Sequence, residues 1–201
     1  MRRHGEIGKM LLESIHTLLQ QAIHPGDAAV DATVGNGRDT LALARAVGDE
    51  GLVCGFDVQE AALARARTRL DREGVSPRVR LLHAGHETLA ERLPGELPAP
   101  LRERVRAVTF NLGFHPGGDR SIITRPESTL PALDAALNLL APGGLLSVVA
   151  YAGHPGGEAE REAVAAWIDD LHESRLLRLE DPARPAITAW LIRVADASGV
   201  R

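Results

Sequence analysis

The sequence has one cysteine (Cys54), one lysine (Lys9) and few aromatic residues, which make up 3% of its 201 positions. A single cysteine excludes an internal disulfide and a zinc site built on several cysteines. Cys54 lies in the apolar run 51–58, which favours a place in the core over a reactive thiol. Because the net charge is −4, the chain has no general attraction to nucleic acid, and any contact with RNA must be local and made by arginine.

Long apolar stretches are also missing. The sequence has no run of 18 apolar residues, the length that could span a membrane. Residues 1–9 are polar, whereas a leader would be basic and then apolar. We therefore expect a soluble protein of the cytoplasm. A chain that is 44% hydrophobic fits one globular domain, which we place at 1–201, with a leading helix in 1–26 and the core in 27–194.

Short apolar runs alternate with segments of helical periodicity, and this alternation predicts a parallel sheet with helices on both faces. Only five residues separate the last two runs, which favours an antiparallel hairpin at the sheet edge. The predicted fold is α/β, with a seven-stranded, mostly parallel sheet and a C-terminal antiparallel hairpin. The predicted strands are 28–32, 51–58, 78–85, 104–112, 144–153, 174–180 and 186–194; the predicted helices are 7–23, 38–47, 59–73, 86–92, 128–140 and 158–172, and 93–100 is a Pro-rich connection.

The stretch "VDATVGNGRDTLALA", residues 30–44, joins the first predicted strand to a helix through two glycines. Gly35 and Gly37 would let the backbone turn sharply and approach a ligand, at the strand end where such sheets bind ligands. A dinucleotide fingerprint is disfavoured, because its third glycine is replaced by Thr40. Asp57 ends the second strand, where a carboxylate can accept hydrogen bonds from both ribose hydroxyls of a nucleoside; its alternative role is a helix N-cap.

An acid at the end of strand one, a Gly-x-Gly turn and an acid at the end of strand two resemble the class I S-adenosylmethionine-dependent methyltransferases. The start "DATVGNGRDT" is similar to RNA methyltransferases that act on amino nitrogens. The stretches "FNLGFHPGGDRSIITRPEST" at 110–129 and "YAGHPGGEAE" at 151–160 resemble the bacterial family labelled rRNA methylase, whose members are similar to MnmM-type tRNA 5-(aminomethyl)-2-thiouridine methyltransferases. The resemblance covers about 27–194 and implies a Rossmann-like class I fold with S-adenosyl-L-methionine as cofactor.

The cofactor that this resemblance implies carries a sulfonium cation, a ribose and an adenine. Asp31 would offset the cation or orient the glycine loop, and Asp57 would bind the ribose with Gln59 beside it. His86 stands where the family places a cofactor contact, or is a surface histidine near a helix start. Asp39 would bind the amino-acid end or stabilise the helix dipole. The predicted cofactor-binding residues are Asp31, Gly35, Asn36, Gly37, Asp39, Asp57, Gln59 and His86.

The end of the fourth predicted strand, "NLGF" at 111–114, has the layout of the [Asp/Asn/Ser]-Pro-Pro-aromatic motif of amino-group methyltransferases, with Leu-Gly in place of Pro-Pro. The Asn111 oxygen can accept amine hydrogens and aim the nitrogen lone pair at the methyl carbon, while Phe114 can stack on a base. An aliphatic amine is mostly protonated at neutral pH, so a proton acceptor or a water path is needed. The predicted catalytic residues are Asn111, His115 and Asp119, although Asp119 could serve only to fold its turn; the predicted substrate-binding residues are Phe114, Arg120, Arg125, Tyr151 and His154, with the two arginines as phosphate contacts.

The sequence therefore predicts an N-methyltransferase that acts on RNA, with the aminomethyl group of the tRNA wobble uridine as substrate and the anticodon stem-loop as partner. An rRNA or small-molecule amine methyltransferase would share the cofactor half, and a non-catalytic nucleotide-binding module would share only the fold. Since no large insertion for RNA recognition lies between the predicted strands, we expect a homodimer. Methyl transfer from a sulfonium needs no Lewis acid, so we expect no metal.

Overall fold

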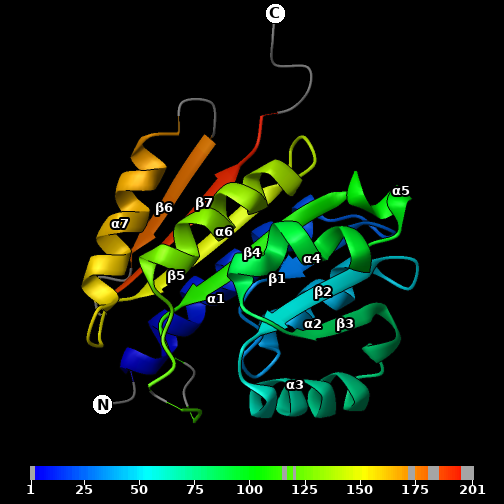
Figure 1. Ribbon diagram of the computed structural model, residues 1–201, viewed down its shortest axis with the longest axis horizontal. Helices are drawn as coiled ribbons and strands as arrows, with labels where there is room; N and C mark the ends of the chain where they lie inside the picture. Colours follow the sequence, from blue (N-terminus) through cyan, green and yellow to red (C-terminus); the bar gives the residue numbers. More distant parts are fainter. Residues whose placement is uncertain (1–2, 115–116, 120, 172–174, 181–185, 196–201) are drawn as a thin grey trace, which may run out of the picture.

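The computed structural model describes residues 3–114, 117–119, 121–171, 175–180 and 186–195. Within them, one sheet has the strand order β3-β2-β1-β4-β5-β7-β6 (Figure 1). The first five strands run parallel, and β7 is antiparallel to both of its neighbours. The strands are β1 (Ala28–Asp31), β2 (Leu52–Asp57), β3 (Val79–His83), β4 (Val105–Leu112), β5 (Leu145–Tyr151), β6 (Arg175–Glu180) and β7 (Ile187–Arg193).

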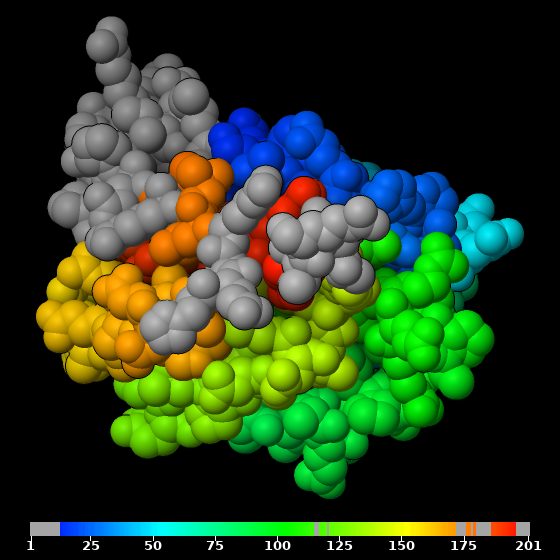
Figure 2. All heavy atoms as spheres, turned by 90° about the horizontal axis from the view of Figure 1, so that it is seen from above, coloured from blue at the N-terminus to red at the C-terminus, as the bar shows by residue number. Residues whose placement is uncertain are grey.

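Helices cover both faces of this sheet. One face carries α1, α2 and α3, and the other carries α4, α6 and α7, so that the molecule has three layers (Figures 1 and 2). In Figure 2 the blue helices α1 and α2 lie on one side of the molecule and the green to yellow-green α4 and α6 on the opposite side. The helices are α1 (Arg3–Ala22), α2 (Arg38–Val47), α3 (Glu60–Arg72), α4 (Leu89–Glu96), α5 (Ala99–Arg102), α6 (Pro126–Leu139) and α7 (Gly157–Asp169), with 3-10 turns at Ser76–Arg78 and His86–Thr88.

Each face of the sheet has its own apolar core. Phe56 and Phe110 belong to the layer beneath α4 and α6, while Ile15 and Leu19 of α1 belong to the layer on the opposite face. Burial of one such side chain stabilises the fold by about 1.5–3 kcal/mol. Cys54 is fully buried, and burial raises the pKa of its thiol to about 12, which confirms its predicted place in the core.

The predicted strands and the C-terminal hairpin are confirmed. The prediction of a Pro-rich connection at 93–100 is wrong. α4 continues through Pro94 to Glu96, and α5 follows it directly. Leu89, Leu93 and Leu97 are spaced by four residues, and all three are buried. Burial of this stripe outweighs the cost of a proline inside the helix, which is about 3 kcal/mol.

The strand order reverses between β1 and β4, because the chain moves outward from β1 to β3 and then returns to β4 on the other side of β1. In open parallel sheets the crevice at such a reversal, beyond the carboxyl ends of the strands, is where ligands bind.

Among the described helices, none is both long enough and apolar enough to cross a bilayer.

Candidate active site

A cleft of about 460 Å³ opens at the carboxyl ends of β1, β2, β3 and β4, within the range of roughly 300–1,000 Å³ typical of small-molecule sites. The predicted site residues that line it are Gly35, Asn36, Asp39, Asp57, Gln59, His86, Asn111, Phe114 and Tyr151. Asp31, Gly37, Asp119, Arg125 and His154 lie outside its lining, and His115 and Arg120 lie outside the described residues.

Asp31 holds the loop that follows β1. Its side chain is fully buried, and its two oxygens accept hydrogen bonds from the Thr33 N–H (3.2 Å) and the Thr40 hydroxyl (2.6 Å). Burial, together with the negative charge of Asp39, raises the pKa of Asp31 to about 7. Of the two predicted roles, this geometry supports orientation of the loop.

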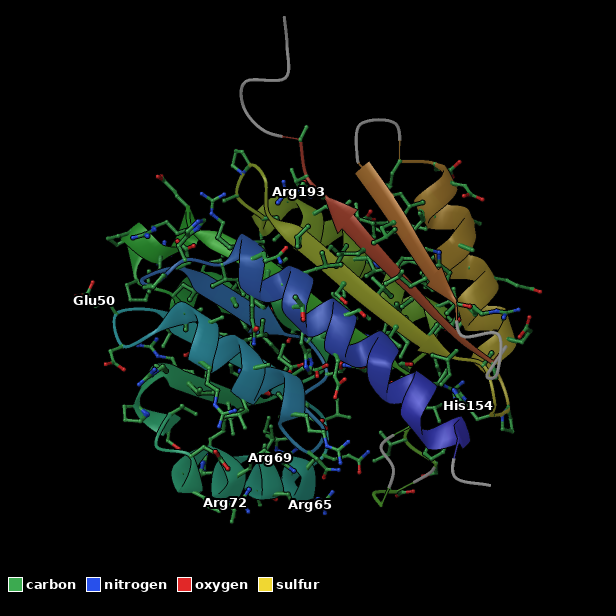
Figure 3. All side chains as sticks on the ribbon, turned by 180° about the vertical axis from the view of Figure 1, so that it is seen from behind. Glu50, Arg65, Arg69, Arg72, His154 and Arg193 are labelled. Carbon is green, nitrogen blue, oxygen red and sulfur yellow. The ribbon has the colours of Figure 1, made fainter. Side chains whose placement is uncertain are left out.

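Gly37 brings the start of α2 against α3. Its φ is +70°, and a Cβ there would lie 2.8 Å from the Cβ of Ala66, so only glycine fits this approach. The close approach is therefore to a helix, whereas the sequence predicted one to a ligand. Arg69 donates to the Asn36 carbonyl (2.8 Å) and Arg65 to the Asn36 side-chain oxygen (3.3 Å), so two arginines of α3 (Figure 3) fix the glycine loop.

The Asp57 carboxylate joins two parts of the cleft. One oxygen accepts the N–H of Gly35 and the other accepts the N–H of Gln59, each at 2.8 Å. Each carboxylate oxygen retains a lone pair for a further donor, such as a ribose hydroxyl. The Gln59 side-chain oxygen accepts the N–H of Asp119 at 3.1 Å, which ties the segment after β4 to the end of β2.

His86 is 7% exposed, and its ring meets Phe110 edge-on at 5.7 Å. The alternative of a surface histidine is therefore wrong. Burial lowers the pKa of His86, so the ring is neutral at neutral pH. Its Nε2 is buried and has no hydrogen-bond partner among the described residues, which leaves it available to a ligand in the cleft.

Asn111, at the end of β4, is held through both its backbone and its side chain. Its N–H donates to Thr33 Oγ1 (2.7 Å), and its Nδ2 donates to Asp39 Oδ2 (2.6 Å). Because an ionised carboxylate can only accept hydrogen bonds, the amide group must present its NH₂ to Asp39. The Asn111 Oδ1 atom is then left to accept a hydrogen bond in the cleft.

His16 of α1, which was not among the predicted site residues, also reaches this site. Its Nε2 lies 2.7 Å from Asp39 Oδ1. Asp39 therefore links two side chains, and its contacts go beyond the predicted interaction with the helix dipole. The spacing of His16 could have identified it as a residue on the inner side of the helix. His16 precedes Leu19 by three residues and Ile23 by seven, and both of these are buried.

The described residues that follow β4 make contact with one another beside the cleft. Phe114 and Ile123 form an antiparallel bridge, and the Gly113 N–H donates to Thr124 Oγ1 (2.7 Å). The Thr124 hydroxyl in turn donates to Glu160 of α7 (2.6 Å). This series of hydrogen bonds anchors the segment that carries the predicted aromatic residue.

Glu160 is a second candidate that was not among the predicted site residues. It is 2% exposed, and it also accepts the hydroxyl of Thr129 on α6 at 2.7 Å. Its spacing of four and eight residues from Val164 and Ile168, both buried, places it in the core-facing stripe of α7 and could have identified it.

Asp119 folds its own turn, as its alternative role predicted. It is exposed and accepts the N–H (2.9 Å) and hydroxyl (2.7 Å) of Ser121, and these hydrogen bonds lower the pKa of Asp119.

His154 meets Phe114 edge-on at 5.7 Å. The buried Nε2 of His154 has no partner among the described residues. Arg125 is exposed at the start of α6.

Comparison with known proteins gives consistent matches. A family model described as "Putative rRNA methylase" matches residues 53–181. A chloroplastic tRNA (mnm(5)s(2)U34)-methyltransferase from Arabidopsis thaliana is 41% identical over 167 residues, and the match covers 79% of this chain but only 59% of that relative.

Solved structures agree over nearly the whole chain. A "putative rRNA-methylase" from Clostridium thermocellum is 36% identical with a TM-score of 0.80, covering 91% of this chain and 97% of that one. A "putative methyltransferase" from Streptococcus mutans, solved in complex with SAH, is 30% identical with a TM-score of 0.74 and the same coverage. The predicted Rossmann-like class I methyltransferase fold is thereby confirmed.

Proposed function

The chain belongs to the rRNA methylase family, and from this premise we propose that it is an S-adenosylmethionine-dependent N-methyltransferase acting on the aminomethyl group of the tRNA wobble uridine. The reaction would convert 5-aminomethyl-2-thiouridine to 5-methylaminomethyl-2-thiouridine. The Arabidopsis relative is named for this activity. The residues of the cleft give the chemical reason for the proposal.

The residues of the cleft suit the proposed cofactor. Asp57 has lone pairs for two ribose hydroxyls, and the unpartnered Nε2 of His86 can bind a further polar group. Gly35 and Asn36 line the same cleft. When bound, the cofactor supplies a methyl group on a sulfonium, an electrophile that needs no metal.

The observation that carries the proposal is the orientation of Asn111. Its NH₂ is used by Asp39, so the Oδ1 atom can accept a hydrogen from a substrate amine. An acceptor in this place orients the nitrogen lone pair, and orientation alone lowers the barrier of a direct displacement. Phe114 lines the same cleft and offers an aromatic face for a base.

The displacement forms a bond between the nitrogen and the methyl carbon, while the carbon–sulfur bond breaks and its electron pair remains on sulfur. The amine must first lose a proton. Asp119 is a weak acceptor because its pKa is lowered and it lies outside the cleft lining, so we propose that the proton leaves through water in the open cleft.

We propose that RNA is contacted by Arg120 and Arg125, which follow β4 in the sequence. They would bind phosphates of the anticodon stem-loop. We also propose a cytoplasmic location, with which a tRNA substrate is compatible. We propose a homodimer because no large insertion separates the described strands, so that the second subunit would extend the RNA surface. Light scattering of the purified protein measures this directly.

The proposal is tested by mass spectrometry of tRNA nucleosides from cells that carry the gene, lack it, or lack it and express Asn111→Ala. We expect 5-aminomethyl-2-thiouridine to accumulate without the gene and to persist with the variant. An unchanged nucleoside profile in the deletion strain would refute the proposed substrate. An Asn111→Ala variant that restores the methylated nucleoside would refute the role of Asn111.

A further inference from the structure

The part of the site that the proposed function does not use is the contact between α1 and α2. His16, Asp39 and Asn111 come from α1, α2 and β4, and they form one hydrogen-bonded series with distances of 2.7 and 2.6 Å. Figure 3 shows α1 and α2 crossing the same face of the sheet. Asp39 and Asn111 line the cleft, whereas His16 does not, so His16 can act only through Asp39.

We propose that His16 is a positioning residue that keeps Asp39 ionised and thereby fixes the side-chain amide of Asn111 with its oxygen toward the substrate amine. This inference rests on the proposed function for its kinetic consequence, but the orientation of the amide can be measured without any substrate.

Asp39 has two possible states, an ionised carboxylate and a neutral acid. As a carboxylate it can only accept, so Asn111 must turn its NH₂ toward it. As a neutral acid it could donate to the Asn111 oxygen, and the amide could then turn its NH₂ toward the cleft. An NH₂ group there would donate where an amine hydrogen needs an acceptor. The charge of Asp39 therefore decides which atom of Asn111 meets the substrate.

The surroundings of Asp39 make its charge depend on a cationic partner. Burial opposes ionisation, and the carboxyl of Asp31 lies near enough for the two to influence each other. The hydrogen bond and charge of His16, supported by Asn111 and Arg38, outweigh the burial and lower the pKa of Asp39.

The surroundings of His16 favour its protonated form. Its hydrogen bond to Asp39 raises the pKa of the imidazole although burial opposes the rise. The charged groups that face it are Asp39 on α2, Asp31 on β1 and Glu13 on its own helix, and all three act in the same direction. The raised folded-state pKa means that the His16 cation is present at lower pH and is lost as pH rises through that value.

The first test is an NMR titration without substrate. We expect the ring of His16, identified by its loss in His16→Gln, to titrate above its ordinary pKa of about 6.5 and to return toward it in Asp39→Asn. The Asn111 side-chain NH₂ signal, identified by its loss in Asn111→Ala, should shift with the same midpoint. An NH₂ signal that does not respond to the titration of His16 would overturn the proposal.

The second test compares His16→Ala and His16→Gln with the matched control His24→Gln, which changes a histidine just beyond the end of α1 whose side chain is 71% exposed. We expect kcat of His16→Ala to fall about tenfold or more, as for residues that orient the ligands of metal sites, while SAH affinity in calorimetry changes less than about twofold. His16→Gln keeps a donor without a charge and should lie between, and its rate relative to wild type should approach unity as pH rises. The control should keep wild-type kcat.

An unchanged kcat in His16→Ala, or a loss of SAH affinity equal to the loss of kcat, would overturn the positioning role. If the wild-type protein methylates no amine, the proposed function fails by itself, and the NMR titration alone then decides whether His16 sets the orientation of Asn111.

Discussion

Asp57 serves two backbone donors and, on our account, two ribose hydroxyls. Replacing it with alanine removes the acceptor of all four, and a hydrogen bond to a charged group contributes about 1.5–3 kcal/mol. We expect Asp57→Ala to raise the dissociation constant for SAH at least about tenfold without changing the circular dichroism spectrum, because Asp57 is only half-buried at the cleft edge. Calorimetry measures this, with the exposed neighbour Glu60→Ala as control. Unchanged affinity in Asp57→Ala would refute the ribose assignment.

At this residue scale, the sequence could predict the groups that follow a strand directly. Asp57 and Asn111 each stand at a strand end, and parallel strands bring their carboxyl ends to one edge of a sheet. The partners of these groups could not be predicted in the same way. His16 lies 23 residues from Asp39, and Arg69 lies 33 residues from Asn36, so both contacts depend on how two helices pack.

At the scale of elements, α7 holds the segment that follows β4 and carries Phe114. It does so through Glu160, which accepts the hydroxyl of Thr124. Glu160→Ala leaves the hydroxyls of Thr124 and Thr129 without their acceptor. The cost is about 1–3 kcal/mol for the buried Thr129 hydroxyl, and it is smaller for Thr124, which is only half-buried. We expect a lower melting temperature and a raised KM for RNA, with SAH affinity within about twofold of wild type. Glu160→Gln retains an acceptor and should be milder. Steady-state kinetics and thermal unfolding measure both effects.

The matched control for α7 is Glu162→Ala, which changes an exposed carboxylate of the same helix. Equal KM values for Glu160→Ala and Glu162→Ala would show that Glu160 does not position the segment. Element prediction succeeded where periodicity was clear and failed at α4, because the sequence shows Pro94 but not the burial of Leu89 and Leu93, and burial decides the outcome.

For the whole molecule, we predict catalysis without a metal ion. The reason is chemical, because methyl transfer from a sulfonium needs no Lewis acid. Activity should therefore be unchanged after dialysis against a chelator, measured with and without added magnesium or zinc. Activity lost to the chelator and restored by one divalent ion would contradict this prediction.

The central claim is that the purified protein methylates the aminomethyl nitrogen of tRNA. The most direct measurement incubates it with labelled S-adenosylmethionine and three RNAs: tRNA bearing 5-aminomethyl-2-thiouridine, the same tRNA without modification, and ribosomal RNA. We predict label only in the first, as 5-methylaminomethyl-2-thiouridine, with activity that falls steeply as salt screens the phosphate contacts. Label in ribosomal RNA, with the aminomethyl-bearing tRNA left unmodified, would contradict the account.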